Sequence, residues 1–593
     1  MLIVMVPLRR FIAFLLVVAA LLSPATPAAA TDFSLVGSGW GHGVGLSQYG
    51  AKAMGADGNA YESIVGHYFN GVIIAPVATA SPLTFVSLDP TPFLVGLIQD
   101  SRTVSFTIES DAARLCFDVT GSCFALVQPG GTYRFGSDGA GGCVFLRIPA
   151  DGRPVAVGHS GSCAASVRPV SDRTVISIPF KARSYRYGTL RFRQDPVSDG
   201  IHTVYEIGID DYMKGLSEVP ESWSTAALEA QVVVSRSYAV WHALDRGDEG
   251  GLSDDRKDEC FCNLRDDTSD QVFRGWTGEA THPRWVAAVA STASQVMTAN
   301  GTIALGLYSS SSGGATEDYV DVFGETGHPY LVTATDGQAF SDSAANPHAT
   351  WTAGYDQAAL AATFGFSWVS NAVVSERNGS GSARSIRLSG IVGGRPAETT
   401  ISGLEMRSSF SLRSTTFDIV VTPQFDDVSA GHRFAGEVLG LSELGITSGC
   451  TALSFCPERP VTRAEMAAFL VRALALPPAG EPAPFADDDG HALEAEIAAL
   501  HASGITSGCT ALSFCPERPV TRAEMAAFLV RALALPPADE PAPFADDDGH
   551  ALEAEIAALH ASGITSGCTA LSFCPERPVT RAETAAFLIR SLA

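Results

Sequence analysis

A repeat with a period of 59 residues occurs three times in a row at the C-terminal end of this chain, and it constrains the fold more than any other feature. Each copy contains the segment GITSGCTALSFCPERPVTRAE, whose first cysteine stands at positions 450, 509 and 568. Each copy also predicts two short helices, the second of which opens with a Thr-x-x-Glu capping box. Because two short helices bury little apolar surface alone, the three copies are expected to pack on one another.

The repeats resemble S-layer homology modules, which begin with Phe-x-Asp, continue through a helix ending in Gly-Ile, and close with Thr-Arg-Ala-Glu before a second helix. The resemblance implies three small all-α modules at residues 424–482, 483–541 and 542–593, and non-covalent attachment to a cell-wall polysaccharide. It implies three ligand-contacting arginines, Arg463, Arg522 and Arg581. An arginine fork suits a carboxylate or a ketal-bearing sugar. Because these arginines stand at helix starts, a solvated surface role stays open for them. The cysteine pairs depart from most such modules, so it also stays open whether the usual binding groove is retained.

The N-terminal end carries the zones of a secretory signal peptide at residues 1–30. Arg9 and Arg10 precede an apolar run that is short for a membrane span, and small residues follow it up to Ala30. We expect cleavage after Ala30, with an uncleaved anchor as the alternative. The protein is therefore predicted to be secreted and to reside at the cell wall or cell surface.

The 12 cysteines form near-neighbour pairs, which behind a signal peptide indicates disulfides made in an oxidising compartment. Each repeat is expected to bridge its own pair. Four cysteines between positions 116 and 163 allow three connectivities, which stay open. The net charge of -25 argues against nucleic acid as a partner, because phosphate binding needs clustered Lys and Arg.

Residues 31–421 are expected to carry the chemistry. The predicted fold class of the chain is α+β, with a mixed α/β domain here that contains a β-rich, disulfide-containing insertion at 76–190. Strand-like residues 203–209 lead to Glu218, and Ser224 is a good N-cap for the helix-like run that follows. Pro220 holds the residue before it in extended geometry. Glu218 is thus mounted on a rigid element just before a helix, as a general acid or base usually is.

A second segment, GSGWGHGVGLSQYGA at residues 37–51, places glycines around His42, so that the backbone can approach a ligand closely. It lacks the features of a phosphate-binding loop. A Ser- and Gly-rich loop at 308–317 suits sugar hydroxyls and N-acetyl groups, with a generic loop as the alternative.

The glutamate segment, the Gly-His-Gly-Val-Gly segment and the SSSSGGATE loop resemble the motifs of the stage II sporulation protein D (SpoIID/LytB) family. In many members the glycine-histidine motif follows the glutamate, whereas here it comes first, which one fold can accommodate if its termini lie close. The resemblance implies a domain that acts on peptidoglycan. The implied catalytic residue is Glu218, and the candidates for substrate contact are His42, Gln48, Tyr49, Ser311, Glu317 and Arg236. Arg236 could equally be a structural polar residue of its helix, and Glu317 an auxiliary carboxylate.

A single dominant glutamate favours a lytic transglycosylase, because most hydrolytic glycosidases need two acids. Glu218 would protonate the glycosidic oxygen and then accept the proton of the sugar's own 6-hydroxyl, leaving a 1,6-anhydro end on a peptidoglycan strand. Apolar neighbours would raise its pKa. The alternatives are a non-catalytic enhancer of a cell-wall amidase, as in another branch of the family, and a structural surface-layer component.

No cofactor is expected. Some family members are reported to hold a metal through Cys and His, but Cys260 and Cys262 stand here without a neighbouring histidine. Structural zinc usually shows four spaced ligands, so zinc stays open beside a disulfide or free thiols.

Overall fold

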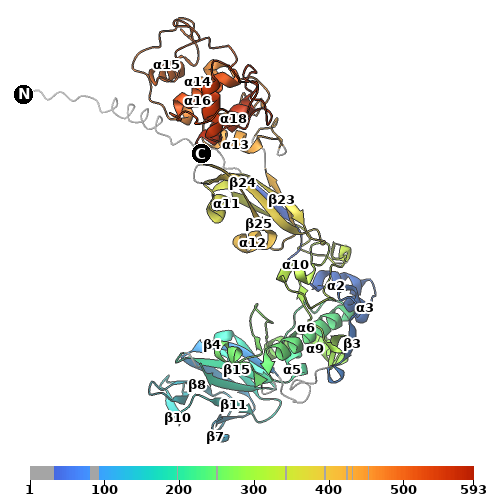
Figure 1. The fold of residues 1–593 in the computed structure, drawn as a ribbon. Helices are drawn as coiled ribbons and strands as arrows, with labels where there is room; N and C mark the ends of the chain where they lie inside the picture. The colour runs from blue at the N-terminus through green and yellow to red at the C-terminus, as the bar shows by residue number, and fades with distance from the viewer. Residues whose placement is uncertain are drawn as a thin grey trace, which may run out of the picture.

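The computed structural model describes residues 32–80, 93–195, 198–248, 251–340, 344–392, 395–421, 425–429, 432–451 and 453–592. The predicted signal peptide lies outside these residues. The fold mixes helices and sheets, as predicted. Figure 1 shows its parts one after another, from the C-terminal repeats through a three-stranded sheet and a helical layer to a pair of larger sheets. None of the described helices has the length and apolarity that crossing a membrane requires.

Two sheets face each other at the end of the molecule opposite the repeats. The first has the order β18 (Leu264–Arg265), β4 (Phe93–Ser101), β15 (Ile201–Ile207), β14 (Thr189–Gln194), β11 (Ala165–Pro169), β6 (Ala113–Phe117) and β7 (Ser122–Val127). The second has the order β10 (Val155–Ser160), β9 (Cys143–Ile148), β8 (Thr132–Ser137), β5 (Thr103–Ser110), β12 (Val175–Ile178) and β13 (Arg183–Arg186). Alternate side chains point inward, as expected of a strand with one buried face. Phe192 of β14 lies 4.4 Å, between ring centres, from Phe135 of β8.

Disulfides join all twelve cysteines as near neighbours. Within the first four, Cys116 pairs with Cys123 across β6 and β7. Cys143 of β9 pairs with Cys163, which stands just before β11, so this bond links the two sheets covalently. Each of the repeats bridges its own pair, as predicted.

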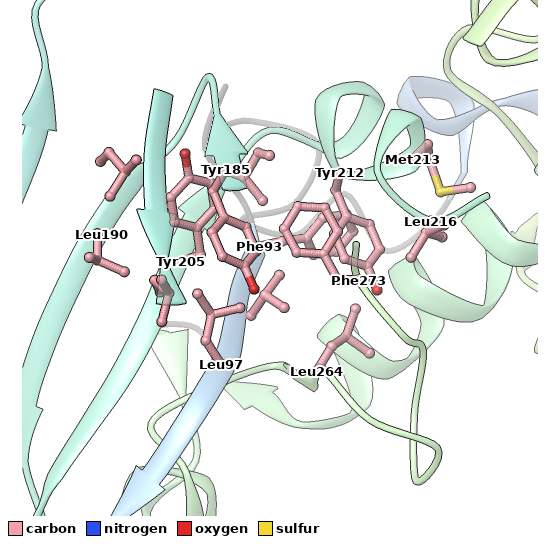
Figure 2. Packing of buried hydrophobic residues seen from close by; sticks show 14 of the residues in the cluster. Phe93, Leu97, Tyr185, Leu190, Tyr205, Tyr212, Met213, Leu216, Leu264 and Phe273 are labelled. Atoms are coloured by element: carbon pink, nitrogen blue, oxygen red, sulfur yellow. The ribbon is translucent and has the colours of Figure 1, made fainter. Parts of the chain in front are cut away.

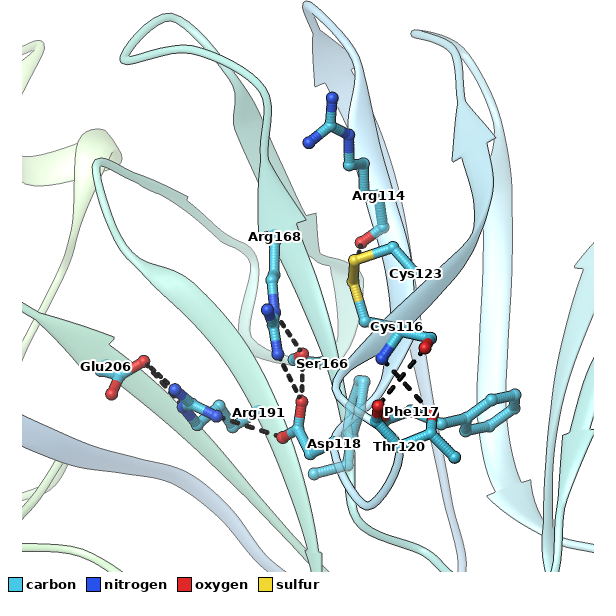
Figure 3. Close-up of polar contacts among 12 residues, drawn as sticks. Arg114, Cys116, Phe117, Asp118, Thr120, Cys123, Ser166, Arg168, Arg191 and Glu206 are labelled. Carbon is cyan, nitrogen blue, oxygen red and sulfur yellow. Dashed lines mark hydrogen bonds and ion pairs between the residues drawn. A yellow bond between two sulfur atoms is a disulfide. The ribbon is translucent and has the colours of Figure 1, made fainter.

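An ion-pair cluster ties neighbouring strands of the seven-stranded sheet together on its polar face (Figure 3). Asp118, just after β6, accepts bonds from Arg168 of β11 and Arg191 of β14 at 3.0 and 3.1 Å. Arg191 also contacts Glu206 of β15 at 2.6 Å. The Asp118 carboxylate therefore links the end of β6 to β11 and β14, across the sheet.

The helical layer is built around α6 (Thr225–Asp245), which starts at the predicted cap, where the Ala227 backbone N–H donates to the Ser224 hydroxyl. Alanines and valines make α6 apolar on nearly every side, and it is buried by its neighbours accordingly. These neighbours are α2 (Gln48–Ala56), α3 (Tyr61–Tyr68), α9 (Pro283–Ser291) and β19 (Gln295–Ala299).

The first described strand, β1 (Asp32–Gly37), pairs antiparallel with both β22 (Trp351–Asp356) and β26 (Phe417–Val421). The glycine-rich loop that follows β1 is thereby held against the far end of the same region. This closeness of the two ends is the condition under which the permuted motif order fits one fold. A further three-stranded sheet lies beside it and consists of β23 (Trp368–Arg377), β24 (Ala383–Val392) and β25 (Arg395–Ser402). It packs with α11 (Gln357–Phe364) and α12 (Gly403–Phe410).

The three repeats close into a ring. The Val461 N–H donates to the Val579 carbonyl, the Val579 N–H to the Val520 carbonyl, and the Val520 N–H to the Val461 carbonyl, all at 2.9–3.0 Å. The helices pair across repeat boundaries as α14 (Arg463–Ala473) with α15 (Glu494–Ala502), α16 (Arg522–Ala532) with α17 (Glu553–Ala561), and α18 (Arg581–Leu592) with α13 (Ala435–Glu443). The last repeat therefore packs on the first. Isolated β-bridges accompany these helices, so the prediction of purely all-α modules is not confirmed.

The arginine that opens the second helix of each repeat lies between two repeats. Each is only 3% exposed, and its Nε donates to a phenylalanine carbonyl of the next repeat. Arg522, for example, donates to the Phe573 carbonyl at 2.8 Å and contacts Glu583 at 3.2 Å. The arginines thus join each repeat to its neighbour around the ring.

We expect Arg522→Met to destabilise the ring, because it leaves the Phe573 carbonyl and Glu583 without this partner inside the interface. The loss should be about 2 kcal/mol, which lowers the Tm of the repeats by roughly 5 °C. Arg531→Met, on the exposed side of the same helix, is the matched control. Differential scanning calorimetry of the full chain checks the shift. Equal Tm values for the two variants would contradict the structural role of Arg522.

Candidate functional site

A pocket of about 610 Å³ opens beside the C-terminal half of α6. Its walls come from the glycine-rich loop after β1, from the segment before α6, from residues 268–272 and from α10 (Tyr319–Phe323). Two predicted site residues, His42 and Glu218, line it. Segments more than 200 residues apart in the chain therefore meet at one concave site, as is typical of ligand-binding pockets.

Glu218 follows the short helix α5 (Ile209–Lys214) on a tight turn. Ser217 adopts a left-handed conformation with φ 47°, and the Trp223 N–H closes the next turn on the Pro220 carbonyl. Beneath the turn, the Tyr212 ring of α5 stacks on Phe273 at 5.0 Å, and Figure 2 shows this stack packed between the strands and Leu216. The turn that carries Glu218 therefore packs on a rigid pair of stacked aromatic rings.

A hydrogen-bonded chain of fixed direction ends on Glu218. The Gln271 amide nitrogen donates to the Ser235 carbonyl, which can only accept, so the orientation of this amide is determined. The same nitrogen donates to the Tyr308 hydroxyl at 3.1 Å, while the Gln271 oxygen accepts from Tyr212. The Tyr308 hydroxyl therefore donates its one proton to Glu218 Oε1, with 3.0 Å between the two oxygens.

Burial raises the pKa of Glu218 to about 7, although the bond from Tyr308 and the positive charge of Arg274 each lower it. A carboxyl of this kind is partly protonated near neutral pH, which is the requirement for a general acid. Because Tyr308 donates to Oε1, the proton of the neutral form belongs on Oε2.

His42 is neutral. Burial and the charge of Arg407 lower its pKa to about 4. Its Nδ1 accepts from the Val44 N–H at 3.0 Å, so Nε2 carries the proton, and the Tyr308 backbone is the hydrogen-bond partner that raises its pKa. His42 lines the pocket, but its ring nitrogens also hold the backbone that presents Tyr308.

Other predicted site residues lie outside this pocket. Gln48 and Tyr49 begin α2, and the Tyr49 ring lies 5.4 Å from Trp223. Ser311 is buried, and its hydroxyl accepts from Asn346. Arg236 is fully buried in the core, where it donates to backbone carbonyls around the end of α9, so the structure gives it a structural position.

Glu317 is buried beside the glycine-rich loop. Its carboxylate accepts from the Ser380 hydroxyl at 2.6 Å, and its backbone N–H donates to the Gly43 carbonyl. A Cβ on Gly43, whose φ is +78°, would lie 2.9 Å from the Glu317 side chain. Burial raises the pKa of Glu317. Its position supports the loop that carries His42.

Sequence reasoning missed Tyr308, Gln271 and Asp270. Gln271 and Asp270 both stand within residues 266–275, a segment that reads D-x-T-x-x-Q-V-x-R-G as in the resembled family. Gln271 is a fixed position of this pattern and Asp270 a variable one, so the pattern could have identified Gln271 alone. Asp270 lines the pocket, pairs with Arg246 at 2.8 Å and accepts from the Arg265 N–H. Tyr308 gave no such signal, because its role depends on a partner 90 residues away.

Cys260 and Cys262 form a disulfide, and both are buried. Their sulfurs are therefore not thiolates, which zinc binding requires. The residues at this position do not fit the metal site reported for some members of the family.

Residues 197–298 match the family model for the stage II sporulation protein, SpoIID, and residues 424–467, 484–526 and 543–585 match the S-layer homology domain. The first match includes Glu218 and Gln271. The other three include the inter-repeat arginines. The chain therefore carries a SpoIID domain and three S-layer homology repeats.

Three curated proteins are similar over limited segments. An S-layer protein of Bacillus thuringiensis subsp. finitimus is 33% identical over 172 residues, which cover 28% of this chain and 21% of that protein. An amidase enhancer of Bacillus subtilis (strain 168) is 43% identical over 44 residues, covering 7% and 6%. An endoglucanase of a Bacillus species is 35% identical over 108 residues, covering 18% and 11%. The chain thus matches about a fifth or less of each of these relatives. Together with the family models, these similarities indicate a protein of the cell surface or cell wall.

The pKa of Glu218 predicts a pH-dependent effect of Glu218→Gln on stability. Because the folded pKa of about 7 exceeds the ordinary value of 4.5, the stability that Glu218 contributes is present below pH 4.5 and is lost as the pH rises to about 7. Glutamine does not titrate. The variant should therefore gain roughly 1–3 kcal/mol over the wild type between pH 5 and pH 8. Thermal unfolding at both pH values checks this, with Glu62→Gln on the exposed side of α3 as control. A difference in Tm that does not change with pH would exclude a raised pKa.

Proposed function

We propose that this chain, which carries a SpoIID domain and three S-layer homology repeats, is a wall-attached lytic transglycosylase of peptidoglycan. The observation that carries the proposal is the pocket carboxyl of Glu218, with a pKa of about 7 and one oxygen fixed by Tyr308. A single acid that is partly protonated near neutral pH, in a pocket large enough for sugar units, suits cleavage of a glycosidic bond.

In the first step, Glu218 Oε2 gives its proton to the oxygen that links muramic acid to the next sugar, and the bond from C1 of muramic acid to that oxygen breaks. The carboxylate that forms is stabilised by the Tyr308 hydroxyl and by the positive charge of Arg274. Both interactions favour the charged form, so they act mainly after the proton has left.

In the second step, the 6-hydroxyl of the same muramic acid attacks C1, and its proton returns to Glu218. The C1–O6 bond replaces the broken bond, no water is consumed, and Glu218 is restored. A hydrolase would need a second free carboxylate near the bond. Asp270, the buried carboxylate of the pocket, is bound to Arg246 and to the Arg265 N–H, which disfavours that role. Asp245 also lines the pocket, but it is exposed at the end of α6.

The repeats would keep the enzyme on the wall by binding a wall polysaccharide, as their match to S-layer homology domains suggests. Arg463, Arg522 and Arg581 were predicted to contact this ligand. Their burial between repeats favours a role in holding the repeats together over direct contact with the polysaccharide.

The second candidate is a non-catalytic glycan-binding enhancer of a separate wall amidase. The observation that favours it is the similarity to the amidase enhancer of Bacillus subtilis, which covers a short segment. In that case Glu218 would contact the glycan without transferring a proton.

Incubation of the full chain with peptidoglycan strands tests the two candidates. The wild type should release 1,6-anhydro-muramic ends, detected by mass spectrometry, and Glu218→Gln should release at least about 100-fold fewer. Glu62→Gln is the matched control. Strands that are bound but not cleaved by the wild type would replace the enzyme proposal with the enhancer.

The Tyr308 bond predicts a shift in the pH profile. Tyr308→Phe removes a donor that favours the carboxylate, so the pKa of Glu218 should rise by about one unit. A general acid must be protonated, so activity falls as the pH rises through this pKa. The alkaline limb should therefore move to higher pH while the maximal rate falls about tenfold. Tyr319→Phe removes a hydroxyl from another ring that lines the pocket. Among the hydrogen bonds of the described residues none joins that hydroxyl to Glu218, so this variant should leave the limb in place. An unshifted limb in Tyr308→Phe would refute this role.

A further inference from the structure

Outside the Glu218 pocket, four rings form a continuous row. The rings of Trp40 and His348 are 4.5 Å apart, those of His348 and Tyr49 are 5.7 Å apart, and those of Tyr49 and Trp223 are 5.4 Å apart. They come from the glycine-rich loop, α2, the segment before α6 and the segment before β22. Local sequence cannot gather these residues, so the fold itself assembles the row.

The row reaches the surface. Trp40 is 47% exposed, and Tyr49 and His348 are partly exposed. The backbone holds Trp40 firmly, because its N–H and carbonyl both bond to Ser311. The preceding Gly39 has φ +85°, and a Cβ there would lie 2.8 Å from the Gly313 backbone. A row of rings that ends in a fixed, exposed tryptophan suits a binding surface, because the indole presents a large apolar face for contact.

Two cations accompany these rings. The Arg413 guanidinium lies 5.3 Å from the centre of the Trp40 ring, and the Lys52 ammonium lies 5.4 Å from that of Tyr49. Among the described residues, neither cation forms an ion pair with a carboxylate. Burial and the Arg413 charge lower the pKa of His348, so the histidine adds no charge. Two cations beside a row of rings, in a chain of net charge -25, indicate an anionic ligand.

The row also connects to the Glu218 pocket. Tyr308, which donates to Glu218, and Ser311, which pairs with Trp40, stand three residues apart, a span of about 10 Å in extended chain. At the other end of the row, Trp223 follows Glu218 by five residues. The row therefore lies close enough to the pocket for one strand of sugars to contact both.

We propose that this row is a second binding site for the glycan strand and that it selects strands bearing carboxylates. Pyranose rings pack their apolar faces against Trp40 and Tyr49, and Arg413 and Lys52 bind the carboxylate of a lactyl group or of an attached peptide. This site rests on the proposed action on peptidoglycan. It adds a preference for muramyl-containing strands over neutral amino-sugar polymers.

The test measures binding in the full chain carrying Glu218→Gln, so that cleavage does not interfere. The probes are soluble muramyl oligosaccharides that keep their carboxylates and neutral N-acetylglucosamine oligomers of the same length. Both probes lack the wall polymer expected to bind the repeats. Isothermal titration calorimetry gives the affinities, and circular dichroism checks that each variant is folded.

Trp40→Ala should weaken binding of both probes about tenfold, and Trp40→Phe should restore part of it. Arg413→Gln should weaken binding of the muramyl probe about tenfold and leave the neutral probe unchanged. The matched controls are Phe180→Ala, which removes a ring that is 85% exposed on the two-sheet part, and Arg384→Gln, at an exposed position of β24.

Unchanged affinity in folded Trp40→Ala would overturn the site, and equal losses for both probes in Arg413→Gln would overturn its preference for carboxylates. These results are separate from the cleavage test. If the wild type makes 1,6-anhydro ends while the row variants bind normally, only this inference fails. If no ends are made while Trp40→Ala loses affinity, the row stands and the chain binds glycan without cleaving it.

Discussion

The hydrogen bond from Tyr308 to Glu218 is the contact on which the site depends, because it joins two segments that lie 90 residues apart in the chain. Glu218 stands on the turn before α6, whereas Tyr308 arrives on β21 (Tyr308–Ser309), paired in parallel with β2 (Leu46–Ser47). That pairing in turn needs the glycine-rich loop to lie against β21, and the loop is held there because β1 pairs with β26. A Glu218 carboxyl with one oxygen fixed by Tyr308 therefore exists only when the two ends of the region meet.

Local signals were sufficient to place Glu218. Pro220 and Ser224 determine where the turn ends and where α6 begins, and both act on residues next to them in the chain. The same signals could not identify Tyr308 or Gln271, since their hydrogen bonds to the site depend on long-range packing. Arg236 shows the opposite limit. Its place in a matched motif left substrate contact and a structural role open, and the turn of α6 on which it lies faces α9, where a buried guanidinium is stabilised by carbonyl acceptors.

The repeats show a similar limit. Their periodicity predicted helices, caps and mutual packing, and the capping boxes of Thr462 and Thr521 are present. Periodicity alone did not predict closure, because a linear stack and a ring have the same sequence pattern. Closure follows from the valine just before each cap, whose N–H and carbonyl serve two different neighbours. Three repeats satisfy all these groups without leaving an open edge, so each added contact in the ring stabilises the other two.

Attachment to the wall would lower the affinity for glycan that the site needs. A chain held on the wall meets its substrate at an effective concentration set by its reach, so that modest affinity in the pocket and the aromatic row is enough. Tight binding of the strand would be a disadvantage, because it stabilises the ground state as much as the transition state. A surface of rings and two partly exposed cations, rather than a deep cleft, is consistent with that requirement. In Figure 1 the repeats lie at the opposite end of the molecule from the two larger sheets, and α6, beside which the pocket opens, lies between these two ends.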